Sequence, residues 1–169
     1  MNSIVENKRI IFLDIDGVLN CQVFYDRVDK GSQERVRNIC NERVSWLNDL
    51  CEKIEADVVV SSTWRLGKTV EYLQKLLNDA GATFKVIDKT PDLRGEGCLR
   101  GNEIYLWLKK NRDYEFKNYV IIDDDSDMLL WQQNHFFKVD SYSGLTPNTC
   151  YKIKRFFGVN TYSKTDFLL

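Results

Sequence analysis

Five short apolar runs alternate with segments of helical periodicity along this chain. We expect strands at residues 9–14, 57–62, 83–87, 118–123 and 136–140. Strands that alternate with helices over short connections are typical of a parallel sheet covered by helices on both faces. The pattern therefore predicts an α/β, Rossmann-like three-layer sandwich with a mainly parallel five-stranded sheet. Because no repeat, low-complexity tract or linker interrupts it, we expect one domain over residues 1–169.

The helices are predicted from apolar spacing and from residues that start or stop a helix. Apolar residues recur on one face of a helix after Asn41, which is a plausible N-cap. A second helix is expected over residues 69–80, where Gly81 ends it. The remaining helices are expected to begin at Asn102, Asp127 and Thr146. Residues 20–41 are polar and are interpreted as irregular.

Polar side chains follow three of the expected strands at the point where each strand ends. They are Asp14 and Asp16 after the first strand, Ser61 and Ser62 after the second, and Asp123, Asp124 and Asp125 after the fourth. The carboxyl ends of parallel strands share one edge of the sheet, which is where such sheets bind ligands. An exposed turn would explain Asp14 and Asp16 alone, but several carboxylates that meet need a cation between them. Oxygen ligands of this kind favour Mg²⁺.

The same segments carry a resemblance to a known family. The stretch FLDIDGVLN resembles the first motif of the haloacid dehalogenase (HAD) superfamily, VVVSS its second, and VIIDDDSD its fourth. The wider pattern, SSTWR, RGNEI and IIDDDSDM in that order, looks like the small HAD-type phosphatases of RNA-repair proteins and phages. It is also broadly similar to the phosphatase domain of phage polynucleotide kinase. The resemblance covers residues 10–157.

The resemblance implies a role for each residue of the first motif. Asp14 matches the nucleophile, which forms an aspartyl-phosphate. Asp16 matches the general acid/base, whose backbone carbonyl also touches Mg²⁺ in this family. The presence of this second acid favours a phosphatase over a dehalogenase. Gly17 fits the turn that leaves the strand edge beside the substrate.

The second and fourth motifs complete the implied site. Ser61 matches the hydroxyl that binds phosphoryl oxygens, and Ser62 is expected to offer a backbone N–H. Asp124 matches the direct Mg²⁺ ligand, whereas Asp123 and Asp127 are expected to hold the metal or its waters. The expected metal site therefore consists of Asp14, Asp16, Asp124 and Asp123.

The third motif requires a cation, and several residues compete for that role. Arg100, followed by GNEI, fits best, while Arg94 and Lys89 lie in the same loop and stay open as alternatives. An arginine would offer a planar pair of donors to phosphate oxygens. Arg65 is a second candidate for contact with phosphate. Trp64 is a candidate for stacking on a base, although a tryptophan beside a strand end more often serves packing.

Composition limits the partners and the compartment that we expect. The net charge of −1 gives no global positive field that would draw the chain to nucleic acid or to a membrane. Its five cysteines include no C-x-x-C pair and accompany no secretion signal, which predicts reduced thiols and a cytoplasmic protein. No apolar stretch is long enough to span a bilayer, and no obligate protein partner is evident. The single histidine, His135, is interpreted as structural rather than as a zinc ligand.

Taken with the resemblance, these features predict a Mg²⁺-dependent phosphomonoesterase that acts on nucleotides or polynucleotide ends. No segment between the first and third motifs is long enough for a separate cap domain, so we expect an open site. The charge balance argues against tight binding of a long phosphate backbone. A phosphatase of a protein or another small metabolite is the alternative. A non-catalytic phosphate-binding module is a third hypothesis, which the presence of both Asp14 and Asp16 disfavours.

Overall fold

A computed structural model describes residues 8–27, 39–111 and 118–159. Five parallel strands form one sheet in the order β3-β2-β1-β4-β5. They are β1 (Arg9–Leu13), β2 (Ala56–Val60), β3 (Val86–Lys89), β4 (Tyr119–Asp123) and β5 (Phe136–Lys138). Leu13 of the central strand lies opposite Val60 on one side and Ile122 on the other. The residues that follow these three strands therefore meet at one edge of the sheet.

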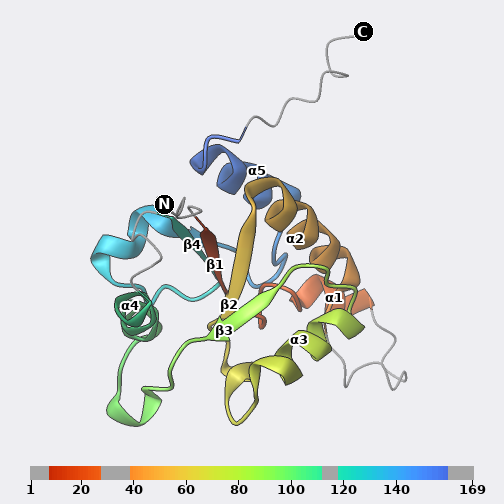
Figure 1. Cartoon of the computed structure of the whole chain (residues 1–169). Coiled ribbons are helices and arrows are strands. Elements are labelled where there is room, and N and C mark those ends of the chain that lie inside the picture. The colour runs from red at the N-terminus through yellow and green to blue at the C-terminus, as the bar shows by residue number, and fades with distance from the viewer. Residues whose placement is uncertain (1–7, 28–38, 112–117, 160–169) are drawn as a thin grey trace, which may run out of the picture.

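Helices cover both faces of the sheet (Figure 1). They are α1 (Gln22–Arg27), α2 (Asn41–Ile54), α3 (Val70–Asp79), α4 (Arg100–Lys110) and α5 (Pro147–Phe156). α2, α3 and α5 contribute side chains to the larger core on one face, and α4 contributes to the smaller core on the other. The predicted three-layer α/β sandwich is confirmed, and the described residues form no large cap.

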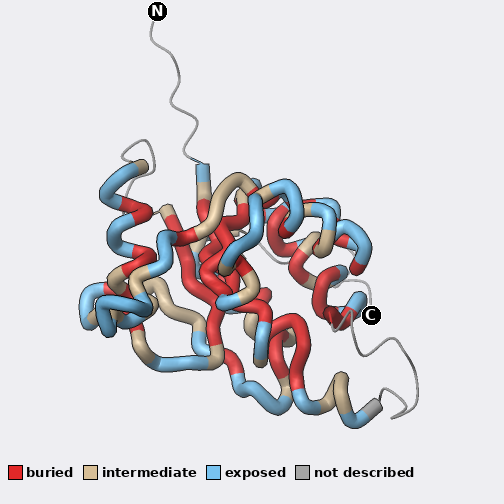
Figure 2. The backbone as a smooth tube through the Cα atoms, turned by 90° about the horizontal axis from the view of Figure 1, so that it is seen from below, coloured by how far each residue is buried: buried red, intermediate tan, exposed pale blue. Residues whose placement is uncertain are grey.

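Side chains of β1 alternate between the two cores, as a strand requires. Ile11 and Leu13 join the larger core, whereas Ile10 and Phe12 join the smaller one. All four are fully buried, and Figure 2 shows the buried backbone running through the middle of the molecule. A central strand buried on both faces holds the residue that follows it in a fixed position.

The predicted helix starts are correct where a threonine caps the helix. Thr69 accepts a hydrogen bond from the Tyr72 N–H, and Thr146 accepts one from the Thr149 N–H. The other predicted caps are wrong: Asn41 is the first residue of α2, whose N-cap is Cys40, and α4 begins at Arg100 instead of after Asn102. Neither Cys40 nor the α4 N-cap uses its side chain for capping, so no sequence signal marks these starts.

Three other elements differ from the prediction. The third strand begins at Val86 instead of residue 83, because it is Val86 that first pairs with β2. The helix expected from Asp127 is a 3₁₀ turn over Leu130–His135. Within the segment 20–41, which was interpreted as irregular, Gln22–Arg27 form α1, and residues 28–38 lie outside the described part of the chain.

The remaining structural expectations concern His135, the cysteines and membrane spans. The Nδ1 atom of His135 hydrogen-bonds to the Tyr119 carbonyl at 2.8 Å, and its ring stacks on that tyrosine at 4.3 Å, so this histidine is structural. All five cysteines are free thiols, four of them buried. In the described part of the chain, no helix has the length and apolarity to cross a bilayer.

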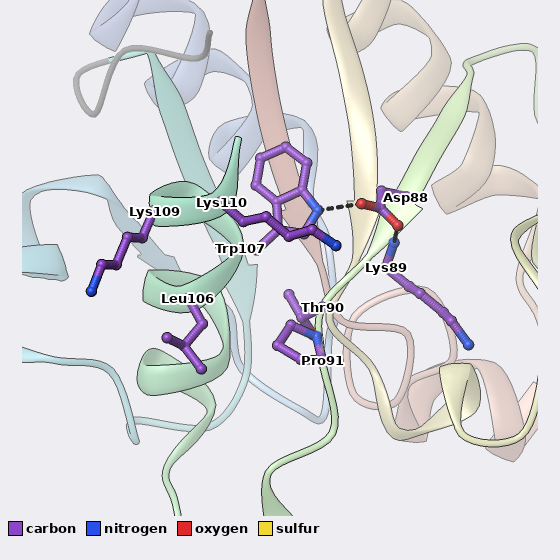
Figure 3. Close-up of a pocket in the computed structure, with 8 residues that line it drawn as sticks. All are labelled: Asp88, Lys89, Thr90, Pro91, Leu106, Trp107, Lys109 and Lys110. Carbon is purple, nitrogen blue, oxygen red and sulfur yellow. Dashed lines mark hydrogen bonds between the residues drawn. The ribbon is translucent and has the colours of Figure 1, made fainter. Parts of the chain in front are cut away.

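A pocket of about 650 Å³ lies between α4 and the edge strand β3. Figure 3 shows Trp107 at the back of this pocket, where its indole N–H donates to Asp88 at 2.7 Å. Lys89, one of the alternative third-motif cations, lines it, but Asp14, Asp16, Ser61 and Arg100 do not. This pocket is therefore not where the sequence places the chemistry.

Candidate active site

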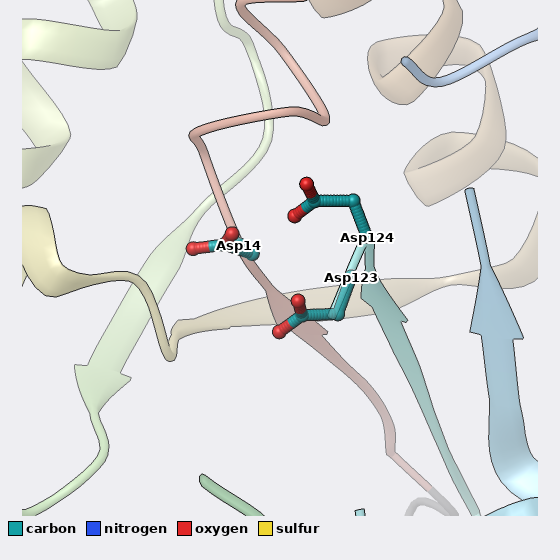
Figure 4. Close-up of side chains that lie close together, drawn as sticks. All are labelled: Asp14, Asp123 and Asp124. Atoms are coloured by element: carbon teal, nitrogen blue, oxygen red, sulfur yellow. The ribbon is translucent and has the colours of Figure 1, made fainter. Parts of the chain in front are cut away.

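Three carboxylates converge at the carboxyl edge of the central strands (Figure 4). Asp14 directly follows β1, Asp123 ends β4, and Asp124 comes next. The Asp14 N–H donates to the Ile122 carbonyl at 3.0 Å, which extends the pairing of the two strands to the site itself. One carboxylate oxygen from each of the three residues lies within 4.8 Å of the others. The sheet thus holds together acids that lie 109 residues apart in the sequence.

Burial makes this cluster electrostatically costly. The exposed fraction is 4% for Asp14 and 0% for Asp123. Burial raises the pKa of both carboxyls, and the negative charge of Asp14 adds to the rise at Asp123, whose pKa reaches about 7. Burial also raises the pKa of Asp124. A bound cation would offset this repulsion, and a donor set of three carboxylates fits Mg²⁺.

Arg100 supplies a positive charge inside the cluster. Its Nη1 atom lies 2.5 Å from an Asp123 oxygen and 3.0 Å from an Asp14 oxygen. It is the first residue of α4, and its backbone N–H donates to Asp127 at 3.0 Å. Within the described residues, the polar contacts of its guanidinium all use Nη1, which leaves Nε–H and Nη2–H free to bind an anion.

The two alternative cations do not reach the cluster. Arg94 pairs with Asp92 at 3.0 Å on the surface. Lys89 donates its ammonium protons to the backbone carbonyls of Arg65 and Lys68. Of the three cations that the sequence left open, Arg100 is the one in contact with Asp14.

Asp16 stands apart from the acidic cluster. It is exposed, and its two carboxylate oxygens accept separate hydrogen bonds from neighbouring side chains. The Asn20 amide donates to Oδ1 at 2.8 Å, and the Trp64 indole N–H donates to Oδ2 at 2.9 Å. Its side chain is therefore held in position but is not used to bind the cluster. Asn20 was missed from the sequence, where an asparagine four residues after Asp16 resembles any turn residue.

Trp64 has the packing role that a tryptophan beside a strand end more often serves. Its indole N–H is engaged by Asp16, and its ring packs against the larger core. It belongs to the 3₁₀ turn Thr63–Arg65 that follows β2. The structure therefore assigns Trp64 to the support of Asp16.

The two serines after β2 are both fully buried. Burial raises the pKa of Asp14, and a hydrogen bond from the Ser62 side chain is among the contributions that lower it. The Ser62 Oγ atom also accepts from the Trp64 N–H at 3.4 Å. The Ser61 Oγ atom is buried without a hydrogen-bond partner in the described structure.

Gly17 is required by both its backbone and its neighbour. Its φ of +70° lies in the left-handed region, where a side chain is disfavoured. A Cβ atom at this position would lie 2.3 Å from an oxygen of Asp124. The turn after Asp16 can therefore approach Asp124 only because residue 17 is glycine.

Arg65 does not occupy the phosphate-binding position that the sequence suggested. It is only 2% exposed, and its five N–H groups are all used inside the protein. The acceptors are the carbonyls of Thr90, Ser61, Ser62 and Pro91 and the carboxylate of Glu103. This guanidinium has no donor left for a substrate, so its role is to brace the loops that follow β2 and β3.

Comparison with known families bears on this geometry. The family model described as the HAD domain in Swiss Army Knife RNA repair proteins matches residues 10–150. The chain belongs to this family. Among curated proteins, no match is found. The HAD assignment confirms the predicted superfamily and supports hydrolase activity of the phosphatase type. In this HAD domain, the matched range contains the acidic cluster, Arg100, Asp16 and both serines.

Proposed function

We propose that this HAD domain is a Mg²⁺-dependent phosphomonoesterase that works through an aspartyl-phosphate at Asp14. The observation that carries the proposal is the position of the Asp14 carboxylate, which contacts the Arg100 guanidinium and lies beside Asp123 and Asp124. A neighbouring guanidinium, together with carboxylates that can bind a metal ion, would allow the Asp14 carboxylate to approach a phosphate dianion. When bound by Asp14 and Asp124, Mg²⁺ would neutralise charge on the phosphoryl group.

In the first step, an oxygen of Asp14 attacks phosphorus and the bond from phosphorus to the ester oxygen breaks. Asp16 gives its proton to the departing alcohol oxygen. The free N–H groups of Arg100 and the Ser62 hydroxyl bind the oxygens of the phosphoryl group during the transfer. The product of this step is a mixed anhydride of Asp14 and phosphate, together with the free alcohol.

In the second step, water attacks phosphorus and the bond from phosphorus to Asp14 breaks. Asp16, ionised after the first step, takes a proton from this water. Inorganic phosphate leaves and the Asp14 carboxylate is regenerated. The separation of Asp16 from the acidic cluster supports this division of labour, because a proton carrier must stay available to the leaving group.

We further propose that the substrate is a nucleotide or the phosphorylated end of a nucleic acid. The family to which the chain belongs is described from RNA repair proteins, which supports this substrate class. A phosphatase of a protein or of another small metabolite is the second candidate. The free thiols fit the reducing cytoplasm that the sequence predicts.

A hydrolysis screen with Mg²⁺ tests the proposal. It would compare mononucleotides, oligonucleotides phosphorylated at the 3′ or 5′ end, phosphopeptides and sugar phosphates, with and without chelator. We expect phosphate release from the nucleotide substrates only when Mg²⁺ is present. Release that persists in excess chelator would contradict the role of the metal, and a preference for phosphopeptides would favour the second candidate.

A further inference from the structure

A smaller pocket, of about 350 Å³, opens directly beside the proposed catalytic residues. Gly17 and Asp124, which meet in the acidic site, form one wall. The other wall consists of Gln22 and Tyr25 from α1 and Ser141 and Tyr142 from the loop after β5. Segments more than a hundred residues apart in the sequence thus enclose one space.

Backbone hydrogen bonds hold this second wall in place. The Gln22 N–H donates to the Ser141 carbonyl at 3.2 Å, and the Val23 N–H donates to the Tyr142 carbonyl at 2.9 Å. The same loop is tied to the segment after Asp16, because the Leu145 N–H donates to the Val18 carbonyl at 2.9 Å. The pocket is therefore a built part of the fold.

The pocket adjoins Asp16, the proposed proton donor. Asn20 lines the pocket and donates to Asp16 at 2.8 Å. The Asp16 charge also contributes, after burial, to the raised pKa of the Tyr25 phenol, so that phenol lies near the carboxylate. Arg100 and Ser62, which would hold the phosphoryl oxygens, are not among the lining residues. The part of a substrate next to Asp16 is the alcohol that leaves, and this pocket is where it would lie.

The lining determines what kind of alcohol fits. It includes two tyrosines, two amides and a hydroxyl, and among the described residues no lysine or arginine lines it. Tyr142 is 59% exposed, so its ring is accessible to a ligand. The charged residue among the described lining residues is the acidic Asp124, which would repel a second phosphate. Aromatic rings with neutral hydrogen-bonding groups suit a planar, uncharged, polar ligand.

We infer that this pocket is the leaving-group subsite and that it takes a single uncharged nucleoside, with the base on Tyr142. This inference rests on the proposed phosphomonoesterase function. The volume lies near the lower end of the range for small-molecule sites, which suits one nucleoside and excludes an extended strand.

A pair of substrates that differ only in the base tests the inference. A nucleoside 5′-monophosphate and ribose 5-phosphate release the same primary alcohol, but only the former can stack. We expect Tyr142→Ala to raise KM for the nucleotide about tenfold more than KM for ribose 5-phosphate, within the range for base stacking on an aromatic ring. Tyr142→Phe, which keeps the ring, should restore most of the preference. Equal changes for both substrates would overturn the inference.

Tyr151→Ala is the matched control, because Tyr151 is an exposed tyrosine of α5 that does not line the pocket. It should leave both KM values unchanged, and thermal unfolding should show that both alanine variants are folded. A nucleoside 3′,5′-bisphosphate should bind no more tightly than either monophosphate. Tighter binding of the bisphosphate would show that the pocket is not the uncharged site inferred.

Binding of free nucleosides, followed by NMR, separates this inference from the proposed function. Adenosine and uridine should shift resonances of wild-type protein, and Tyr142→Ala should weaken both. If no phosphate ester is hydrolysed but nucleosides still bind in this manner, the proposed function fails and the subsite stands. If esters are hydrolysed but neither the nucleosides nor the base preference depends on Tyr142, the subsite fails and the function stands.

Discussion

Arg65 and Arg100 carry the same side chain near the same edge of the sheet, but their guanidinium groups meet different partners. Arg65, with 3% of its side chain exposed, donates every N–H to one of four backbone carbonyls or to Glu103. Arg100, with 13% exposed, faces Asp14 and Asp123 through one nitrogen and keeps other donors free. Burial alone does not distinguish them. The distinguishing feature is whether donors remain for a ligand.

The comparison also explains why one arginine is structural. All the donors of Arg65 are bonded to fixed acceptors, so this cation stabilises one arrangement of the surrounding loops. Arg100 faces the carboxyls of Asp14 and Asp123, whose pKa values are raised. It is therefore part of a charged site that a metal ion or a phosphate can complete. We therefore expect Arg65 variants to lose stability and Arg100 variants to lose activity.

The largest expected effect is on stability, from Arg65→Met. This change removes five hydrogen bonds and leaves the buried Glu103 carboxylate without its partner, 2.6 Å away. Breaking a buried ion pair in this way costs about 3–5 kcal/mol of the free energy of unfolding. Urea titration followed by circular dichroism measures the loss. An unfolding free energy within about 1 kcal/mol of wild type would show that the bracing role is wrong.

Arg100→Gln should reverse this pattern. We expect kcat to fall by about 10²–10³-fold, as when one preorganised donor to a developing charge is removed. Arg100→Lys should recover part of the rate, because it restores the charge but not the planar donor geometry. Steady-state kinetics measures the loss of rate, and urea titration of the same proteins measures whether their stability is kept. An Arg100→Gln protein that keeps its rate but unfolds at a lower urea concentration would show that Arg100 is structural, like Arg65.

Gly17→Ala should have a smaller effect, and Gly97→Ala is its matched control. Gly17 and Gly97 both have φ near +70°, but a Cβ atom at Gly97 meets nothing within 4 Å. Each alanine should cost about 1–2 kcal/mol for the left-handed backbone. Only Gly17→Ala should also displace Asp124 and weaken Mg²⁺ binding, which calorimetry would detect. Equal Mg²⁺ affinity in the two variants would contradict the tight approach of residue 17 to Asp124.

The acidic cluster also predicts a pH dependence of the stability of the metal-free protein. Folding raises the Asp123 pKa to about 7 from 3.8, so the folded state binds the additional proton. The protonation of Asp123 therefore contributes to the free energy of unfolding. This contribution is fully present below pH 3.8 and is lost as the pH rises through about 7, with a slope of at most about 1.4 kcal/mol per pH unit. Asp123→Asn should flatten this slope relative to wild type. Parallel profiles for the two proteins would show that Asp123 is not held as described.

Much of the fold and part of the site follow from the sequence. Apolar runs fix the strands, and parallel pairing then brings Asp14 and Asp123 together, so local patterns were enough for the acidic cluster. Threonine caps gave correct helix starts at Thr69 and Thr146 for the same reason. These features depend on residues close in sequence or on a rule that holds for every parallel sheet.

The errors involve choices that only tertiary packing makes. In the sequence, Arg65 and Arg100 both lie near the end of an expected strand or helix. No neighbouring residue indicates that Glu103 and four carbonyls surround Arg65. The pocket that includes Tyr25 and Tyr142 depends on how α1 docks against the loop after β5.

The central claim is that Asp14 receives the phosphoryl group, and an acid-quenched reaction tests it directly. Protein mixed with Mg²⁺ and a phosphate ester would be quenched within one turnover, digested and sequenced by mass spectrometry. We predict phosphate on the peptide that contains Asp14, lost in Asp14→Asn and accumulated in Asp16→Asn when a substrate with a good leaving group is used. Phosphate on another residue, or turnover by Asp14→Asn at a rate near that of wild type, would contradict the account.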